Sequence, residues 1–177
     1  AVLSAPSGGA VQLLPAAAVG GAYLTDPHVL VGAWNGFDAG GTASALQYDV
    51  CIGTTPLGCQ MQPFGPAPDP PASSPSAGVS GPRTFDGLSL PCGATYFLAV
   101  RATNCAGLTR TVASEGARLC CSPPSGGAVS VHDGAGEAVG FATNATALTV
   151  RWSGFVEPCS GVRGYNVSLL VPLVTAV

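Results

Sequence analysis

Short apolar stretches with alternating polar positions follow one another along this chain, separated by turn residues. In the stretch 95–103, Tyr96, Leu98 and Val100 fall on one side and Arg101 on the other, which is the two-residue period of a half-buried strand. No apolar pattern of helical period lasts three turns, because 25 Gly and 16 Pro interrupt the sequence. The pattern therefore predicts an all-β protein. The predicted strands span residues 9–14, 29–34, 45–52, 83–90, 95–103 and 108–119.

A Pro- and Ser-rich segment, residues 63–82, separates two of these predicted strands. Proline has no N–H group to donate to a neighbouring strand, so such a segment cannot pair as a central strand. We therefore expect a long loop there.

Two parts of the chain repeat each other in the same order. The letters "PSGGAV" begin at Pro6 and again at Pro124, and "W-x-G-F" begins at Trp34 and again at Trp152, each time 118 residues later. Such a repeat indicates tandem domains. We place the first domain at 1–122 and the second at 123–177. The second holds only three of the predicted strands, so we expect the protein to continue beyond its last residue here.

The segment "LSLPCGATYFLAVRATNCAGL", residues 88–108, resembles the last three strands of a fibronectin type III domain. Tyr96 takes the place of that family's corner tyrosine, and Trp34 and Tyr48 agree with its second and third strands. The resemblance implies tandem immunoglobulin-like, fibronectin III-like β-sandwiches, the second one incomplete. The pattern "W-x-G-F … S-G-x-x-x-Y-x-V" is similar to repeats of very large extracellular and ciliary-surface glycoproteins, including mastigoneme-like ones. The long loop and the cysteines depart from the usual module.

Seven cysteines are present, and their spacing is not that of a zinc site. There is no C-x-x-C, and neither histidine has a thiol nearby in the sequence. Disulfides are the better interpretation, and they indicate an oxidising compartment. The disulfide candidates are Cys51, Cys59, Cys92, Cys105, Cys120, Cys121 and Cys159.

Two disulfide pairings follow from the predicted strands, and the partner of a further cysteine stays open. Cys51 and Cys59 flank a short turn-rich loop, so a local bridge is expected. Cys92 and Cys120 would face each other at the open end of a hairpin made by 95–103 and 108–119. Cys159 has two possible partners. One is Cys121, and the other is a cysteine of the second domain that lies beyond this chain; we prefer the second.

Two N-x-S/T sequons, at Asn144 and Asn166, are candidates for N-glycosylation. Asn166 lies between Tyr165 and Val167. In a strand its side chain would point away from both neighbours. N-linked glycans would agree with the compartment that the cysteines indicate.

Composition and motifs exclude several function classes. Only 8% of residues are charged, the net charge is −3, and no basic run could neutralise phosphates, so we expect no nucleic-acid partner. No apolar run is long enough to span a membrane. His28 and His132 are expected in surface loops, and no G-x-S-x-G occurs. A loop calcium site at Asp38 and Glu157 has too few oxygens nearby. We expect no enzyme, no cofactor and no metal.

These observations together favour a non-enzymatic structural or adhesive segment of an extracellular glycoprotein. It would be one bead in a stiff multi-domain rod or filament at a cell or cilium surface. Its partners would be neighbouring modules of the same chain and other copies or glycoproteins of an assembly. The alternative is a ligand-binding receptor ectodomain that uses the loops after 29–34 and after 95–103. A third hypothesis is an accessory module of a secreted hydrolase.

Overall fold

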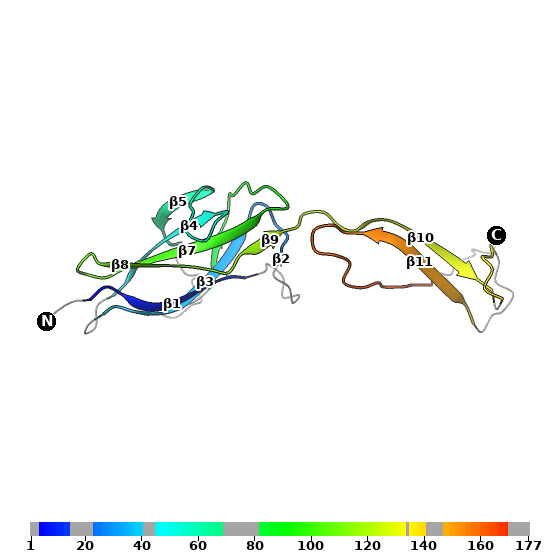
Figure 1. The fold of residues 1–177 in the computed structure, drawn as a ribbon, viewed down its shortest axis with the longest axis horizontal. Helices are drawn as coiled ribbons and strands as arrows, with labels where there is room; N and C mark the ends of the chain where they lie inside the picture. Colours follow the sequence, from blue (N-terminus) through cyan, green and yellow to red (C-terminus); the bar gives the residue numbers. More distant parts are fainter. Residues whose placement is uncertain are drawn as a thin grey trace, which may run out of the picture. The chain divides into compact units, whose positions relative to one another are not determined.

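The computed structural model describes residues 4–14, 23–40, 45–68, 82–133, 135–140 and 147–169. The described residues form strands, turns and extended segments, so the protein is all-β as predicted. No helix occurs among them, and none there could cross a membrane. The chain divides into two compact units, Ala1–Cys121 and Ser122–Val177, called unit one and unit two below. Figure 1 labels most of the strands of both units.

Unit one contains two sheets. The first has the order β1-β3-β6, with β1 at Ser7–Leu14, β3 at Leu30–Asp38 and β6 at Arg83–Phe85, all antiparallel. The second has the order β2-β9-β7-β4-β5, and β8 also pairs with β7. Its strands are β2 (Tyr23–Leu24), β4 (Gln47–Gly53), β5 (Gln62–Pro66), β7 (Thr95–Thr103), β8 (Thr109–Ala113) and β9 (Ala117–Leu119).

The central strand β7 has the predicted bounds, because every second residue from Tyr96 to Ala102 is buried. Two other predictions need correction. The predicted strand 83–90 ends at Phe85, and the amides of Leu88 and Leu90 instead donate to the carbonyls of His28 and Pro27 at 3.1 and 3.0 Å. The predicted strand 108–119 is divided into β8 and β9.

The predicted loop 63–82 is also corrected at its start. Gln62–Pro66 forms β5, which pairs antiparallel with β4 at the end of the strand order. Proline is compatible with such an edge strand, because one side of the strand has no neighbour that would need its N–H group for a hydrogen bond. Residues 69–81 lie outside the described part of the chain.

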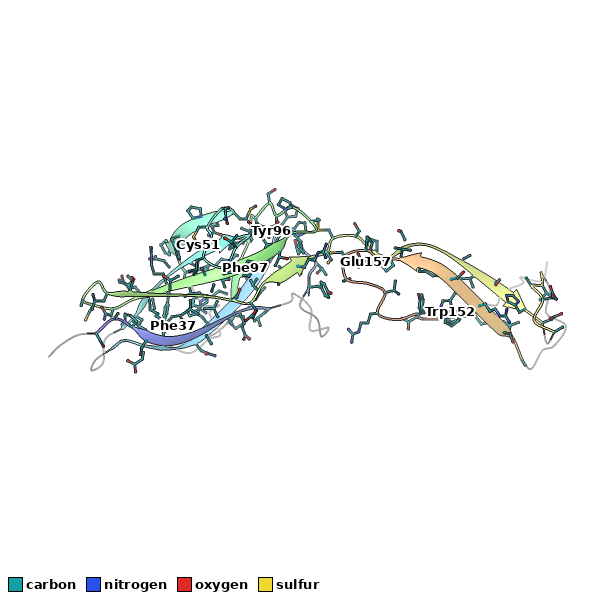
Figure 2. The ribbon with its side chains drawn as sticks, in the orientation of Figure 1. Phe37, Cys51, Tyr96, Phe97, Trp152 and Glu157 are labelled. Carbon is teal, nitrogen blue, oxygen red and sulfur yellow. A yellow bond between two sulfur atoms is a disulfide. The ribbon has the colours of Figure 1, made fainter. Side chains whose placement is uncertain are left out.

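The two sheets of unit one pack face to face through one apolar core. Trp34 of β3 and Tyr96 of β7 are both buried, and Figure 2 labels Tyr96 among the side chains of this unit. Gly32 of β3 faces Leu98 of β7 so closely that a Cβ atom at Gly32 would collide with the leucine methyl group. The core comprises Leu24, Leu30, Trp34, Val50, Ile52, Phe85, Leu90, Tyr96, Leu98, Val100, Ala117 and Leu119.

Two polar side chains inside unit one are satisfied by main-chain groups. The buried Tyr96 hydroxyl donates to the carbonyl of Pro91 at 2.7 Å, and burial raises the pKa of this phenol above its ordinary value. The Asn104 amide donates to the carbonyls of Ser4 and Ala39 at 2.9 and 3.1 Å. Its oxygen accepts two amides of the β7–β8 turn. Asn104 therefore ties three segments together at one end of unit one.

Unit two repeats the first hairpin of unit one in register. Its strands β10 (Ser125–His132) and β11 (Thr149–Val156) are antiparallel. Ser125 faces Val156 just as Ser7 faces Asp38, and each of the seven pairs lies 118 residues after its counterpart. The sequence repeat is therefore a structural repeat.

A glycine beneath a phenylalanine ring defines this hairpin in both units. Gly9 and Gly127 have φ angles of 95° and 94°, in the region that favours glycine. A Cβ atom on either residue would overlap the ring of Phe37 or Phe155 respectively. The ring thus lies against the backbone of the opposite strand, and a larger residue cannot take the glycine's place without displacing it.

We predict that Gly9→Ala destabilises unit one by about 2–4 kcal/mol, because it adds the cost of a left-handed alanine to that of overpacking the Phe37 ring. Gly36→Ala is the matched control: its φ is 70°, but no atom lies within 4 Å of the added Cβ. The control should lose only about 1–2 kcal/mol. Urea unfolding followed by Trp34 fluorescence, in a Trp152→Phe background, measures both. Equal losses would contradict the ring contact.

Candidate functional site

The cysteines form the most extensive chemical feature of the described residues. Six of the seven are disulfide-bonded, and the exposed Cys105, in the turn between β7 and β8, is a free thiol. This state suits an oxidising compartment, as the sequence indicated.

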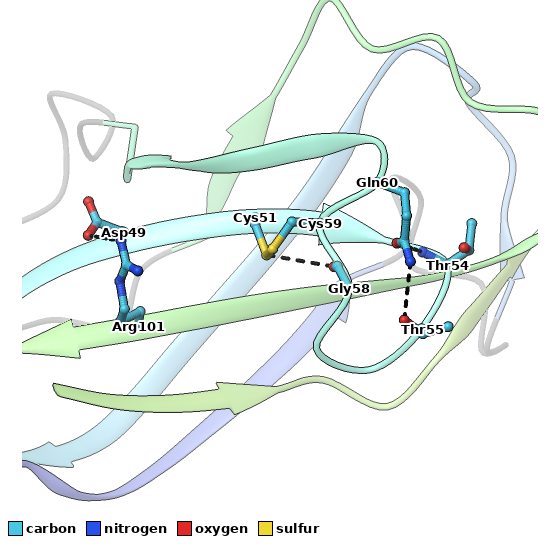
Figure 3. The surroundings of a disulfide bond; sticks show 8 residues. All are labelled: Asp49, Cys51, Thr54, Thr55, Gly58, Cys59, Gln60 and Arg101. Carbon is cyan, nitrogen blue, oxygen red and sulfur yellow. Dashed lines mark hydrogen bonds and ion pairs between the residues drawn. A yellow bond between two sulfur atoms is a disulfide. The ribbon is translucent and has the colours of Figure 1, made fainter.

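The predicted local bridge between Cys51 and Cys59 is confirmed (Figure 3), with a Cα–Cα distance of 5.3 Å. Cys51 is fully buried in β4, and Cys59 ends the loop that follows. The loop is closed by Gln60, whose side-chain oxygen accepts the Thr54 amide at 3.1 Å, and by the Gly58 amide, which donates to the Thr55 carbonyl. The bridge therefore fastens a turn-rich loop onto β4.

The predicted pairing of Cys92 with Cys120 is wrong, because Cys92 is bonded to Cys121, with a Cα–Cα distance of 5.8 Å. The reason lies in the hairpin register. Along β8, Ala99 faces Ala113, and continuing this register would bring Cys92 opposite Cys120. Along β9 the pairing is shifted by one residue, so that Thr95 faces Arg118 and Cys92 comes opposite Cys121.

One extra residue between β8 and β9 produces this shift. The Ser114 hydroxyl accepts the Leu98 amide at 3.0 Å, and the Ser114 amide donates to the Leu98 carbonyl at 2.8 Å. Beyond it the backbone of Gly116 passes so close to Phe97 and Thr95 that a Cβ atom would be within 2.7 Å of both. The irregularity therefore depends on a glycine. In the sequence the letters "SEG", residues 114–116, were the sign of a break between β8 and β9.

The remaining bonded cysteines are Cys120 and Cys159. Because Cys121 is held by Cys92, the suggested Cys121–Cys159 bridge is excluded. Cys159 is disulfide-bonded in this structure.

We predict that the Cys92→Ala/Cys121→Ala pair destabilises unit one more than Cys51→Ala/Cys59→Ala does. The sequence separations are 29 and 8 residues. The loop-entropy relation then gives about 3.5 and about 2.5 kcal/mol. Chemical unfolding of the two double variants, compared with the parent chain, measures the difference. A larger loss for the shorter loop would show that packing around the buried Cys51 outweighs the entropy of the unfolded chain.

A second local feature is the turn that follows β11. The Glu157 carboxylate, 7% exposed and labelled in Figure 2, accepts the Ser160 hydroxyl at 2.6 Å, the Ser160 amide, and the Cys159 amide at 3.0 Å. These hydrogen bonds, led by that of the Ser160 hydroxyl, lower the pKa of Glu157 to about 2. The carboxylate therefore closes the turn only in its charged form.

We predict that this turn loosens as the pH falls from about 4.5 towards 2. The pKa of Glu157 is lower in the folded chain than the ordinary 4.5, so its stabilisation is complete above that value and is lost below it. NMR titration of the Glu157 carboxyl carbon and the Ser160 amide should give a common midpoint near the lower value. Glu157→Gln should abolish the amide titration, whereas Glu115→Gln, at an exposed position of unit one, should not. A midpoint at the ordinary value would contradict the assignment.

The two sequons differ in what the structure describes. Asn144 lies outside the described residues. Asn166 is exposed, and its neighbour Tyr165 packs against the rings of Trp152 and Phe155 at centroid distances of 5.6 and 5.7 Å. The sequon is therefore accessible and adjoins a fixed aromatic side chain.

The counterpart in unit one clarifies the position of Asn166. Tyr48 packs against Trp34 and Phe37 as Tyr165 does in unit two, and the next residue is Asp49. The Asp49 carboxylate meets Arg101 on the outer side of the sheet at 2.9 Å, with both side chains 36% exposed. In unit one the residue at this place in the repeat thus points away from the core, whereas Asn166 is exposed in a segment of unit two that forms no strand.

The two histidines and the two acidic residues considered for calcium all form hydrogen bonds with main-chain groups. His28 and His132 contact the carbonyls of Leu88 and Gly136 through Nδ1, both at 2.9 Å. Asp38 accepts the Gly40 amide at 2.7 Å, and Glu157 accepts the amides of its own turn. Within the described residues no group of three or more potential ligands could hold a metal.

Comparison with known proteins adds no assignment: no family model, no curated protein and no solved structure matches this chain.

Proposed function

We propose that this chain is a structural segment of an extracellular glycoprotein, in which fibronectin III-like sandwiches follow one another as beads of a stiff rod or filament. The observation that carries the proposal is the repeat of one hairpin at a constant spacing of 118 residues, with identical register. Tandem copies of one module are typical of proteins whose role is to span distance and to present repeated surfaces.

The strand orders of unit one support the fibronectin III-like assignment. Its two sheets have the orders β1-β3-β6 and β2-β9-β7-β4-β5, which are compatible with such a sandwich, with β2 as a short additional edge strand. The bond from the Tyr96 hydroxyl to the Pro91 carbonyl matches the tyrosine corner of that architecture. A fold of this kind supports many functions, and the fold alone therefore does not decide among them.

Three features of the chain favour an extracellular structural role. The disulfides are typical of secreted proteins. The exposed Asn166 offers a place for a glycan on the outer side of unit two. With only 8% charged residues, the chain has few groups that keep its own surface hydrated. Attached sugar or contact with neighbouring copies would supply what the charges do not. A mastigoneme-like or similar cell- or cilium-surface assembly fits these requirements.

Peptide mass mapping of native protein, unreduced and reduced, with and without enzymatic removal of glycans, tests the proposal. We expect linked peptides for Cys51–Cys59 and Cys92–Cys121, and a mass change at Asn166 on deglycosylation. Recombinant chain from a reducing cytosol is the matched control. Free thiols together with unmodified asparagines in the native protein would exclude the extracellular glycoprotein.

The structural role needs a separate measurement. Electron microscopy of native surface material labelled with antibodies against unit one should show regularly spaced label along filaments. Label confined to dispersed single molecules would contradict the rod and would favour the receptor alternative.

A further inference from the structure

Unit two presents an apolar sheet face that is covered in unit one. Val129, Leu148 and Trp152 lie on β10 or at β11 and are 64%, 41% and 41% exposed. The counterparts of Leu148 and Trp152, Leu30 and Trp34, are 1% and 5% exposed. The same face is thus built twice and covered once.

The repeat shows what covers this face. In unit one the inner side of β1 and β3 packs against Val50 and Ile52 of β4 and Leu98 and Val100 of β7. Since the hairpin of unit two has the same register, its face has the shape for the same kind of sheet. Tyr165 already occupies the place of Tyr48, the first inward residue of β4, against the tryptophan and phenylalanine rings.

One position differs and determines which sheet fits. Gly32 of unit one corresponds to Val150 of unit two, since Leu13 faces Gly32 and Val131 faces Val150. In unit one even a single carbon atom at this position would collide with Leu98. A strand that carries leucine there must therefore move that side chain to settle onto unit two, and a strand with a much smaller side chain need not.

We propose that the apolar face of unit two binds a β-sheet segment of this same repeat type, with the inward pattern of β4 and β7 but with alanine or glycine in the place of Leu98. Val150 is the specificity-determining residue. The proposal goes beyond the structural function proposed above, and the disulfide and glycan map does not depend on it.

The size rule can be tested first inside unit one, where both sheets are present. Gly32→Val should lower the urea midpoint strongly, and Leu98→Ala alone should lower it too. The double variant should lose less stability than the sum of the two single losses, because the cavity left by Leu98→Ala accepts the valine side chain of Gly32→Val. Additive losses would overturn the size rule.

Docking onto unit two is tested with the full chain carrying Trp34→Phe, so that Trp152 is the remaining tryptophan. The probe is a synthetic peptide of residues 95–113 with Cys105→Ser, made with Leu98 and with Leu98→Ala. We expect a blue shift of Trp152 fluorescence and binding about tenfold tighter for the alanine peptide, since overpacking by a side chain costs at least a factor of that order. Val150→Gly in the full chain should remove this preference.

Three results would overturn the proposal. The peptides could bind equally well to the parent chain, neither could bind, or sedimentation could show that the free chain already buries Trp152 by self-association. The last result would assign the face to a second copy of the chain.

Discussion

The contact between the Phe37 ring and the backbone of Gly9 determines how the first sheet of each unit is built. The ring needs a partner strand without a Cβ atom, and this fixes β1 against β3 in one register. Tyr48 also packs against the same ring, edge to face at a centroid distance of 5.7 Å, which links the first sheet to β4 of the second. Unit two has the same three residue types in the same contacts, at Gly127, Phe155 and Tyr165. The contact of glycine, phenylalanine and tyrosine is thus preserved in unit two, although the described residues of that unit contain no second sheet.

The central strand β7 depends on this arrangement from the other side. It pairs with β4, β8 and β9, and its inward residues fill the space that Gly32 leaves open. The end of β7 where Tyr96 lies is fixed by the bond to Pro91, and the turn that follows β7 is fixed by Asn104. The disulfide at Cys92 and the buried polar contacts therefore act on a strand that is already surrounded by apolar packing.

The sequence predicts much of this fold and less of its detail. Alternation placed β7 correctly because every inward position is apolar, and it placed β1, β3 and β4 because their turns are marked by glycine and proline. It missed β2 and β5, which are short and, in β5, contain prolines that an edge strand accepts. The predicted partner of Cys92 was wrong by one residue, because a regular hairpin has no extra residue between β8 and β9. The extra residue lies beside Gly116, whose backbone approaches the Phe97 ring of the neighbouring strand, and such a contact between distant segments is not visible in the sequence. The sequence repeats both the glycines, Gly9 and Gly127, and the phenylalanines, but it does not show that each phenylalanine ring lies against a glycine.

The Cys92–Cys121 bond also determines how unit one would respond to tension along the chain. A pull applied at Ser122 reaches Cys121 and passes through the sulfur atoms to Cys92, so that the 28 residues between the two cysteines carry none of it. Those residues include β7, β8 and β9. The extension that unit one can release on stretching is thereby shortened by roughly 100 Å, at about 3.5 Å for each residue kept out of the stretched chain. The same bond keeps β7 out of the covalent path of the force, which acts first on the pairing of β1, β3 and β6 and on the pairing of β4 with its neighbours β5 and β7.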